Sequence, residues 1–166
     1  MNILVVCHGN VCRSPLAEVA LIRALPTYVT VTSAGFVGPG RLAAKKVREY
    51  ATSHNYDLSQ HRSKIATLRD LHENDLILYM DEKNLNHLNL LSIPAVSEKA
   101  ISLGTLVGLQ KIQDPAFIPR GEKLDEILGT IVQACKNLAA YIRARKDPRL
   151  SARVSRYPIN SQRYVR

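Results

Sequence analysis

The chain has 166 residues, of which 46% are hydrophobic and 22% charged, so it can form one domain with a packed core. This composition excludes a chain that is disordered throughout, and no apolar run approaches the roughly 20 residues that a membrane-spanning helix needs. The formal net charge of +9 favours an anionic partner without identifying it.

The first predicted element is a buried strand at the N-terminus. Residues 3–6 are four consecutive branched apolar residues, typical of a strand covered on both faces of a parallel sheet. The run is too short for a signal-peptide core and no cationic segment precedes it, so we expect a cytoplasmic protein without a membrane span. The odd number of cysteines argues against a disulfide framework.

A helix and a second strand are predicted next. Ser14 is expected to be the helix N-cap, with Pro15 at the first helical position and Pro26 ending the helix. Residues 28–32 are rich in β-branched side chains and predict a strand. Residues 33–40 contain glycines and a proline, which is typical of a loop.

The rest of the chain continues to alternate between helices and strands. A helix ending near Asn55 precedes a third buried strand over residues 76–80, and Asp81 is the expected N-cap of the helix that follows. Residues 100–103 predict a short fourth strand, and Leu124 to Arg145 a long amphipathic helix. This alternation predicts right-handed βαβ units and an α/β fold with a parallel sheet.

The composition changes after Lys146. Residues 147–166 hold five arginines and one acidic residue, a charge of +4. We therefore expect two units: a domain over residues 1–146, and a basic, flexible C-terminal tail over residues 147–166. The tail could bind an anionic partner. Nucleic acid is disfavoured as a partner, because no recognition motif accompanies the charge.

The segment that predicts chemistry is the octapeptide Cys7-His8-Gly9-Asn10-Val11-Cys12-Arg13-Ser14, between the first strand and the first helix. Backbone amides in such a loop, with a helix N-terminus behind them, bind a dianion. Gly9 is expected to permit the turn, and Arg13 can hold two phosphate oxygens. The same positive field favours the thiolate of Cys7, which could attack phosphorus and form a phosphocysteine.

These residues resemble the signature of the low-molecular-weight protein tyrosine phosphatase family. The likeness spans residues 6–18 and continues at residues 32–35, 58–63 and 80–85 and at Asp114-Pro115, so it covers roughly residues 1–145. The resemblance implies a four-stranded parallel sheet flanked by helices on both faces, with the phosphate loop between the first strand and the first helix. It also implies that no metal or organic cofactor is needed.

The resemblance implies three catalytic residues, Cys7, Arg13 and Asp114. Asp114 would protonate the leaving group and later activate the water that hydrolyses the phosphocysteine. The expected substrate is a phosphorylated protein carrying phosphotyrosine, or a small aryl phosphate. The substrate-binding residues would be those of the loop: His8, Gly9, Asn10, Val11, Cys12, Arg13 and Ser14.

Supporting roles are also implied by the resemblance. Asn10 would hold the loop in shape through side-chain hydrogen bonds, with Ser33 and His61 as its partners. Two further residues would act on the catalytic groups. Ser14 would donate a hydrogen bond to the thiolate of Cys7, and Asp81 would orient Arg13.

Cys12 matches the second loop cysteine of the family, which implies redox protection of Cys7 through a disulfide. His8 departs from the family, where an aliphatic or small residue is more usual. A protonated His8 would favour the thiolate further, or its ring would point outward. Phe36 and Phe117 are the aromatic residues expected near the pocket, fewer than is usual for phosphotyrosine recognition.

Two other functions remain open from the sequence. Arsenate reductases share the fold and the nucleophile loop, but they need further cysteines after the third strand. Residues 75–110 contain none, and Cys135 is expected on the apolar face of the last helix. A non-catalytic phosphate-binding regulatory module would be expected to lack one of Cys7, Arg13 and Asp114, and all three are present.

Overall fold

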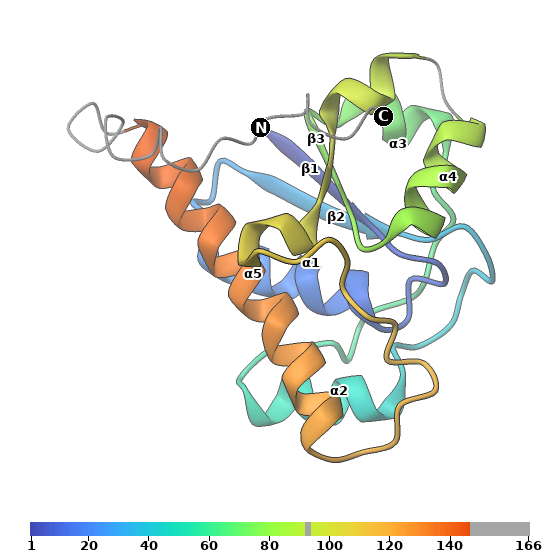
Figure 1. Ribbon diagram of the computed structural model, residues 1–166, viewed down its shortest axis with the longest axis vertical. Helices are drawn as coiled ribbons and strands as arrows, with labels where there is room; N and C mark the ends of the chain where they lie inside the picture. Colours follow the sequence, from blue (N-terminus) through green and yellow to red (C-terminus); the bar gives the residue numbers. More distant parts are fainter. Residues whose placement is uncertain (92–93, 147–166) are drawn as a thin grey trace.

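The chain forms a four-stranded parallel sheet in the order β2-β1-β3-β4 (Figure 1). The computed structural model describes residues 1–91 and 94–146, so the predicted basic tail lies outside the described residues. Within those ranges, no helix is both long enough and apolar enough to cross a membrane. The strands are β1 (Asn2–Val6), β2 (Thr30–Ala34), β3 (Leu76–Tyr79) and β4 (Ala100–Ser102).

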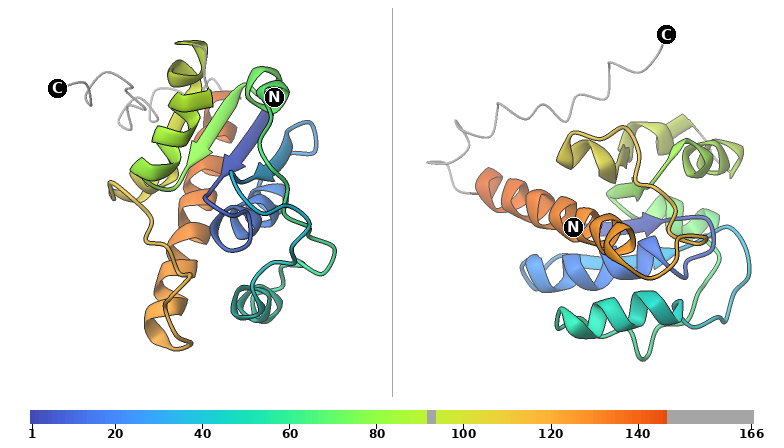
Figure 2. Two further views of the ribbon diagram at one scale, coloured as in Figure 1. Left: turned by 90° about the vertical axis from the view of Figure 1, so that its right-hand side faces the viewer. Right: turned by 60° about the horizontal axis from the view of Figure 1, so that its bottom comes forward.

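Helices cover both faces of the sheet, as Figures 1 and 2 show. On one face, Ile3 and Val5 pack in a core with α1, α2 and α5, while Leu4 and Val6 face a second core with α3 and α4. Because the central strand is buried on both faces, it is apolar at every position from residue 3 to residue 6. The helices are α1 (Arg13–Ala24), α2 (Lys45–Ser53), α3 (Leu68–Glu73), α4 (Glu82–Leu91) and α5 (Glu122–Lys146), with 3₁₀ helices at η1 (Pro94–Lys99) and η2 (Leu103–Val107).

The register of the sheet brings the loops after β1 and β2 together at the carboxyl ends of these strands. Val6, the last residue of β1, pairs with Ala34, the last residue of β2. The loops that follow these parallel strands therefore leave the sheet side by side, where α/β proteins usually bind ligands.

Two local predictions about the first helix and the second strand were wrong. Helix α1 begins at Arg13, and Cys12 precedes it without a side-chain cap, so Ser14 is not the N-cap. The Ser14 hydroxyl is instead committed to polar contacts in the loop. Strand β2 starts two residues later than predicted and includes Ser33 and Ala34, because both pair with β1.

The other strands and α-helices were predicted correctly, except for one missed α-helix, and the two 3₁₀ helices were not predicted. The side chain of Asp81 accepts a hydrogen bond from the Asn84 backbone N–H at 2.9 Å, which confirms it as the cap of α4. The sequence analysis did not predict α3, although Thr67 and Asp70 form a capping box at its start.

Candidate active site

Four successive carbonyl groups of the loop between β1 and α1 are turned outward. Each accepts a hydrogen bond from a residue outside the loop. The pairs are His8 with the Phe36 amide at 2.8 Å, Gly9 with Arg41 Nη2 at 2.9 Å, Asn10 with His61 Nε2 at 2.8 Å, and Val11 with the Ala44 amide at 2.8 Å.

The backbone amides of the same loop are left facing inward. In a trans peptide the C=O and N–H groups point in opposite directions, so turning the carbonyls outward turns the N–H groups toward the centre of the loop. The amides of residues 8–12 donate no hydrogen bond to any described residue. With the N-terminus of α1 directly behind them, these amides form a cradle for a tetrahedral dianion.

Cys7 lies at the base of this cradle, where β1 ends. It is 3% exposed, and its Sγ lies 3.0 Å from Ser14 Oγ. Ser14 Oγ already accepts a hydrogen bond from Asn10 Nδ2 at 2.9 Å. The single Ser14 hydroxyl proton is therefore free to point at the sulfur, which is closer than the alternative acceptor, the Ala34 carbonyl at 3.4 Å.

A buried chain of hydrogen bonds extends from this sulfur to α1. Asn10 Nδ2 also donates to Ser33 Oγ at 2.8 Å, and Ser33 Oγ donates to Glu18 Oε2 at 2.5 Å. Asn10 and Ser14 are fully buried. Because each hydroxyl in the chain both accepts and donates, the network is satisfied and holds the loop in one conformation.

The loop residue with a left-handed backbone conformation is Asn10, not Gly9. Asn10 has φ = 50°, whereas Gly9 is not among the residues with positive φ. The expectation that Gly9 is needed for the turn is therefore wrong. A Cβ on Gly9 would instead lie 2.9 Å from Arg41 Nη2, whose guanidinium also binds the carbonyls of Val37 and Gly38.

The Arg13 guanidinium lies between two carboxylates. Nη1 donates to Asp81 at 2.5 Å and to the Ile112 carbonyl at 3.1 Å, and Nη2 donates to Asp114 at 2.8 Å. Arg13 is 2% exposed, and its Nε is buried without a hydrogen-bond partner among the described residues. A buried, unpaired N–H is costly, so the Nε–Nη2 edge is the one suited to an incoming oxyanion.

Asp114 is the more accessible of the two acids. Its side chain is 46% exposed, against 16% for Asp81. Asp114 Oδ1 accepts a hydrogen bond from the Ala116 backbone N–H at 3.0 Å, which holds the carboxyl group against its own loop. Of the two carboxylates that contact Arg13, Asp81 is therefore the more buried and Asp114 the more open to solvent.

Aromatic side chains form one rim of the loop. The Phe36 ring stacks on His87 of α4 at 4.8 Å between centroids, and His8 meets the same imidazole edge-on at 5.8 Å. Phe117, in the Asp114 loop, is 98% exposed. His8 therefore contributes to a small aromatic wall with Phe36, which the sequence analysis did not foresee because His87 is remote in sequence.

The three cysteines of the chain are all buried. Burial together with the charge of Cys7 raises the pKa of Cys12 to about 11, so Cys12 remains a thiol at neutral pH. Cys135 is fully buried on α5, and burial raises its pKa as well. No cysteine of the chain is thus exposed for an arsenate-reductase relay.

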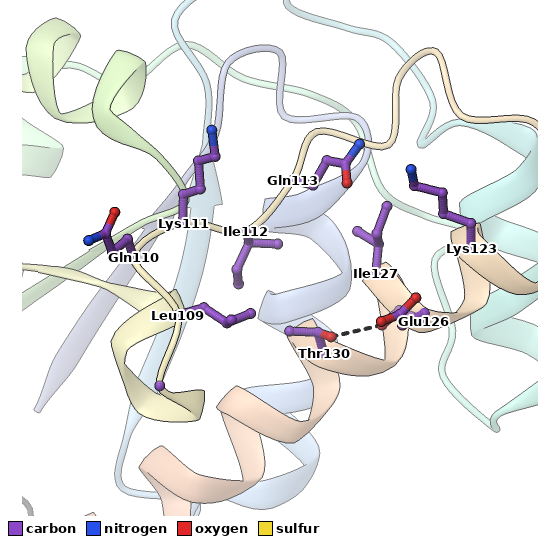
Figure 3. Close-up of a pocket in the computed structure, with 10 residues that line it drawn as sticks. Leu109, Gln110, Lys111, Ile112, Gln113, Lys123, Glu126, Ile127 and Thr130 are labelled. Atoms are coloured by element: carbon purple, nitrogen blue, oxygen red, sulfur yellow. Dashed lines mark hydrogen bonds between the residues drawn. The ribbon is translucent and has the colours of Figure 1, made fainter.

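A cavity of about 540 Å³ lies beside the site, between residues 108–113 and α5 (Figure 3). Leu109, Ile112 and Ile127 line it together with Lys111 and Lys123. It includes no residue of the phosphate loop, so it is separate from the cradle. Ile112 connects the two, because it lines the cavity and its carbonyl accepts a hydrogen bond from Arg13.

Comparison with known proteins identifies the family of this chain. Residues 2–148 match the family model described as low molecular weight phosphotyrosine protein phosphatase. The chain belongs to the low molecular weight phosphotyrosine protein phosphatase family. It is therefore a phosphatase, and the sequence resemblance and the predicted four-stranded α/β fold are both confirmed.

Individual relatives agree with this assignment. The low molecular weight protein-tyrosine-phosphatase Wzb of Salmonella typhi is 38% identical over 117 residues, covering 69% of this chain and 76% of the relative. Etp of Escherichia coli K12 is 30% identical over 139 residues, 83% of this chain and 92% of the relative. Among solved structures, Vibrio vulnificus Wzb in complex with benzylphosphonate has a TM-score of 0.77 at 31% identity, covering 84% and 97% of the two chains.

The phosphatase fold brings together every site residue that the sequence predicted. The loop, its supports Ser33 and His61, and the acids Asp81 and Asp114 all lie around Arg13 and Cys7. One predicted contact was wrong: the Asn10 side chain binds Ser33, but His61 binds the Asn10 backbone carbonyl. Three polar residues that also shape the site were missed. They are Glu18, Arg41 and Lys46, whose contacts with the site carry no local sequence signal.

Proposed function

We propose that the phosphatase hydrolyses phosphate monoesters through a covalent phosphocysteine on Cys7. The observation that carries this proposal is the set of four outward carbonyls, which leaves the amides of the loop that follows Cys7 facing inward. A dianion held there would place phosphorus above Cys7, opposite the leaving oxygen. The Cys7–P bond forms as the bond from phosphorus to the leaving oxygen breaks.

In this proposal, Arg13 and the loop amides stabilise the transferring phosphoryl group. Two phosphate oxygens would take the Nε–Nη2 edge of Arg13, the other oxygens would take the amides, and Asp114 would exchange its contact with Arg13 for one with the leaving oxygen. The Ser14 hydroxyl stabilises the thiolate when the phosphocysteine breaks down.

Asp114 serves as general acid and then as general base. A phenolate is a poor leaving group unless it is protonated as the P–O bond breaks. The half-exposed carboxyl of Asp114 can give its proton to that oxygen, and can then take a proton from the water that attacks the phosphocysteine. Pro115 stiffens the loop next to it.

We propose phosphotyrosine on proteins as the substrate class. A relative of known structure binds benzylphosphonate, a phosphonate that carries an aromatic ring. In this chain the stacked pair of Phe36 and His87, with His8 and the exposed Phe117, offers aromatic surface beside the cradle. An aromatic ester can stack there, whereas a small alkyl phosphate would contact less of it.

The general-acid role predicts a leaving-group effect. Asp114→Asn should slow the first step with phenyl phosphate by about 10²–10⁴-fold, since positioned acids contribute that much. The activated ester 2,4-dinitrophenyl phosphate should be slowed far less, because its leaving group needs no proton. The measurement is the burst of phenol release in rapid-mixing experiments, which isolates the first step.

Asp125→Asn, an exposed substitution on α5, is the matched control and should leave both bursts unchanged. Equal slowing of the two esters by Asp114→Asn would show that Asp114 is not the acid. Wild-type protein should hydrolyse a phosphotyrosine peptide faster than a phosphoserine peptide and should not turn over arsenate with thiols. The reverse preference would refute the proposed substrate class.

We propose that Cys12 protects Cys7 from irreversible oxidation. Peroxide converts the Cys7 thiolate to a sulfenic acid, and the Cys12 thiol displaces its hydroxyl as water to give a disulfide. Two observations support this: both cysteines are buried in the same short loop, and the charge of Cys7 contributes to the raised pKa of Cys12. Because the pKa of Cys12 is raised, Cys12 does not compete as a nucleophile at neutral pH.

This protection predicts different recovery after oxidation. Wild-type protein inactivated by peroxide should regain most of its activity with dithiothreitol, whereas Cys12→Ser should regain much less, because its Cys7 continues to the sulfinic acid. Cys135→Ala, which removes a remote buried thiol, should recover like wild type. Recovery to the same level in Cys12→Ser would exclude the protective role.

A further inference from the structure

Lys46, the second residue of α2, directs its ammonium group at the loop that carries Asp114. Its Nζ donates to the carbonyl oxygens of Pro115 at 2.6 Å, Ala116 at 2.9 Å and Ile118 at 2.6 Å. An ammonium group has three N–H donors and no acceptor, so these three carbonyls use its full capacity. Hydrogen bonds from a charged donor are stronger than neutral ones.

The start of α2 also holds the phosphate loop. Two residues before Lys46, the backbone N–H of Ala44 donates to the Val11 carbonyl at 2.8 Å. One short segment of α2 therefore fixes the loop of the nucleophile and the loop of the acid relative to each other.

Besides Lys46, the Asp114 loop is held to the rest of the domain by the ion pair of Asp114 with Arg13 and by the partly buried side chain of Ile118. Within the loop, Asp114 Oδ1 accepts from the Ala116 N–H, and the Pro115 carbonyl accepts from the Ile118 N–H at 3.1 Å. The Phe117 side chain is 98% exposed and anchors nothing. The ion pair of Arg120 with Glu49 is solvent-exposed, and such pairs contribute little.

We propose that Lys46 is the positioning residue for the general acid. By gathering three carbonyls of the loop onto α2, it holds the Asp114 carboxyl at a fixed height over the Cys7 sulfur. This inference rests on the proposed role of Asp114 in leaving-group protonation. Lys46 itself touches neither the phosphate nor the leaving group, and it acts only through the loop backbone.

The test is Lys46→Met, which keeps the aliphatic chain and removes the three donors. We expect the burst rate with phenyl phosphate to fall about 10- to 100-fold, since displacing a catalytic group by 1 Å can cost about 10²-fold. The burst with 2,4-dinitrophenyl phosphate and the inhibition constant of vanadate should change little. Lys46→Arg, which keeps charged donors, should recover part of the rate.

Lys45→Met removes the same charge from the exposed neighbouring residue and is the matched control, expected to behave as wild type. Combining Lys46→Met with Asp114→Asn separates positioning from a general structural role. In the Asp114→Asn background, Lys46→Met should cause no further loss, because the group that it positions is already absent.

Two results would overturn the role of Lys46 while leaving the acid role of Asp114 intact. One is that Lys46→Met lowers the burst rate as much in the Asp114→Asn background as in wild type. The other is that Lys46→Met slows both esters equally. Failure of Asp114→Asn alone to discriminate between the two esters would instead overturn the acid role, and the Lys46 inference with it. Thermal melting of each variant measures folding separately, and a folded Lys46→Met with the wild-type burst would also refute the proposal.

Discussion

Cys7→Ser should abolish turnover of p-nitrophenyl phosphate, lowering kcat by a factor on the order of 10⁵ or more, as removal of an enzymatic nucleophile does. A serine hydroxyl is far less acidic than a thiol, so the inward amides and Arg13 cannot ionise it at neutral pH. The substitution changes one atom and leaves the outward carbonyl contacts of the loop intact. Binding of phosphate or vanadate should therefore survive.

The experiment compares steady-state turnover with vanadate binding measured by calorimetry on the same preparation. Cys135→Ala is the control, because it removes a thiol that is fully buried on α5 and outside the site. Turnover near the wild-type level by Cys7→Ala, which has no nucleophile at this position, would rule out Cys7 as the nucleophile. Loss of vanadate binding would instead show that the sulfur is needed to form the cradle.

Arg13→Lys should lower kcat/KM by about 10²–10³-fold, the typical effect of removing one preorganised donor to a transition-state oxyanion. Lysine presents a point charge and cannot offer the two parallel donors of the Nε–Nη2 edge. It also cannot reach Asp81, the Ile112 carbonyl and Asp114 together. Vanadate affinity should fall about 10-fold or more, since hydrogen bonds to charged groups are worth ~1.5–3 kcal/mol.

The same substitution should also lower the free energy of unfolding. Lysine keeps the positive charge, but its single ammonium group cannot replace all the guanidinium contacts, so buried acceptors lose charged donors. Urea unfolding of Arg13→Lys would measure this, with Arg69→Lys as the control, because Arg69 is 81% exposed in its pair with Glu73. Wild-type kinetics in a folded Arg13→Lys would contradict the bidentate role.

The sequence alone was sufficient for the parts of the site that are local. A cysteine at the end of a buried strand and an arginine at the start of a helix lie within seven residues, and their meaning follows from backbone geometry. The family resemblance then supplied Asp114, whose dipeptide with Pro115 is uninformative by itself. The alternating strands and helices likewise predicted the parallel sheet.

What the sequence could not show depends on contacts between distant segments. Lys46 meets its carbonyls about 70 positions away, and no spacing rule predicts a lysine bound to backbone oxygens. The cap of α1 was misplaced because tertiary contacts with Cys7 and Asn10 compete for the Ser14 hydroxyl. Similarly, the turn was predicted at Gly9, but Asn10 is the residue with positive φ. The sequence did not distinguish them because glycine and asparagine both tolerate a left-handed backbone.

The outward carbonyl contacts of the phosphate loop have a consequence for folding. Their donors lie between Phe36 and His61, so none of them belongs to the β1–α1 unit that contains the loop. A nascent chain that has released only this first unit has the nucleophile in place but nothing to orient its peptide groups. Competence for phosphate would thus arise late, when β2 and the start of α2 dock, and free phosphate would stabilise the assembled domain over its early intermediates.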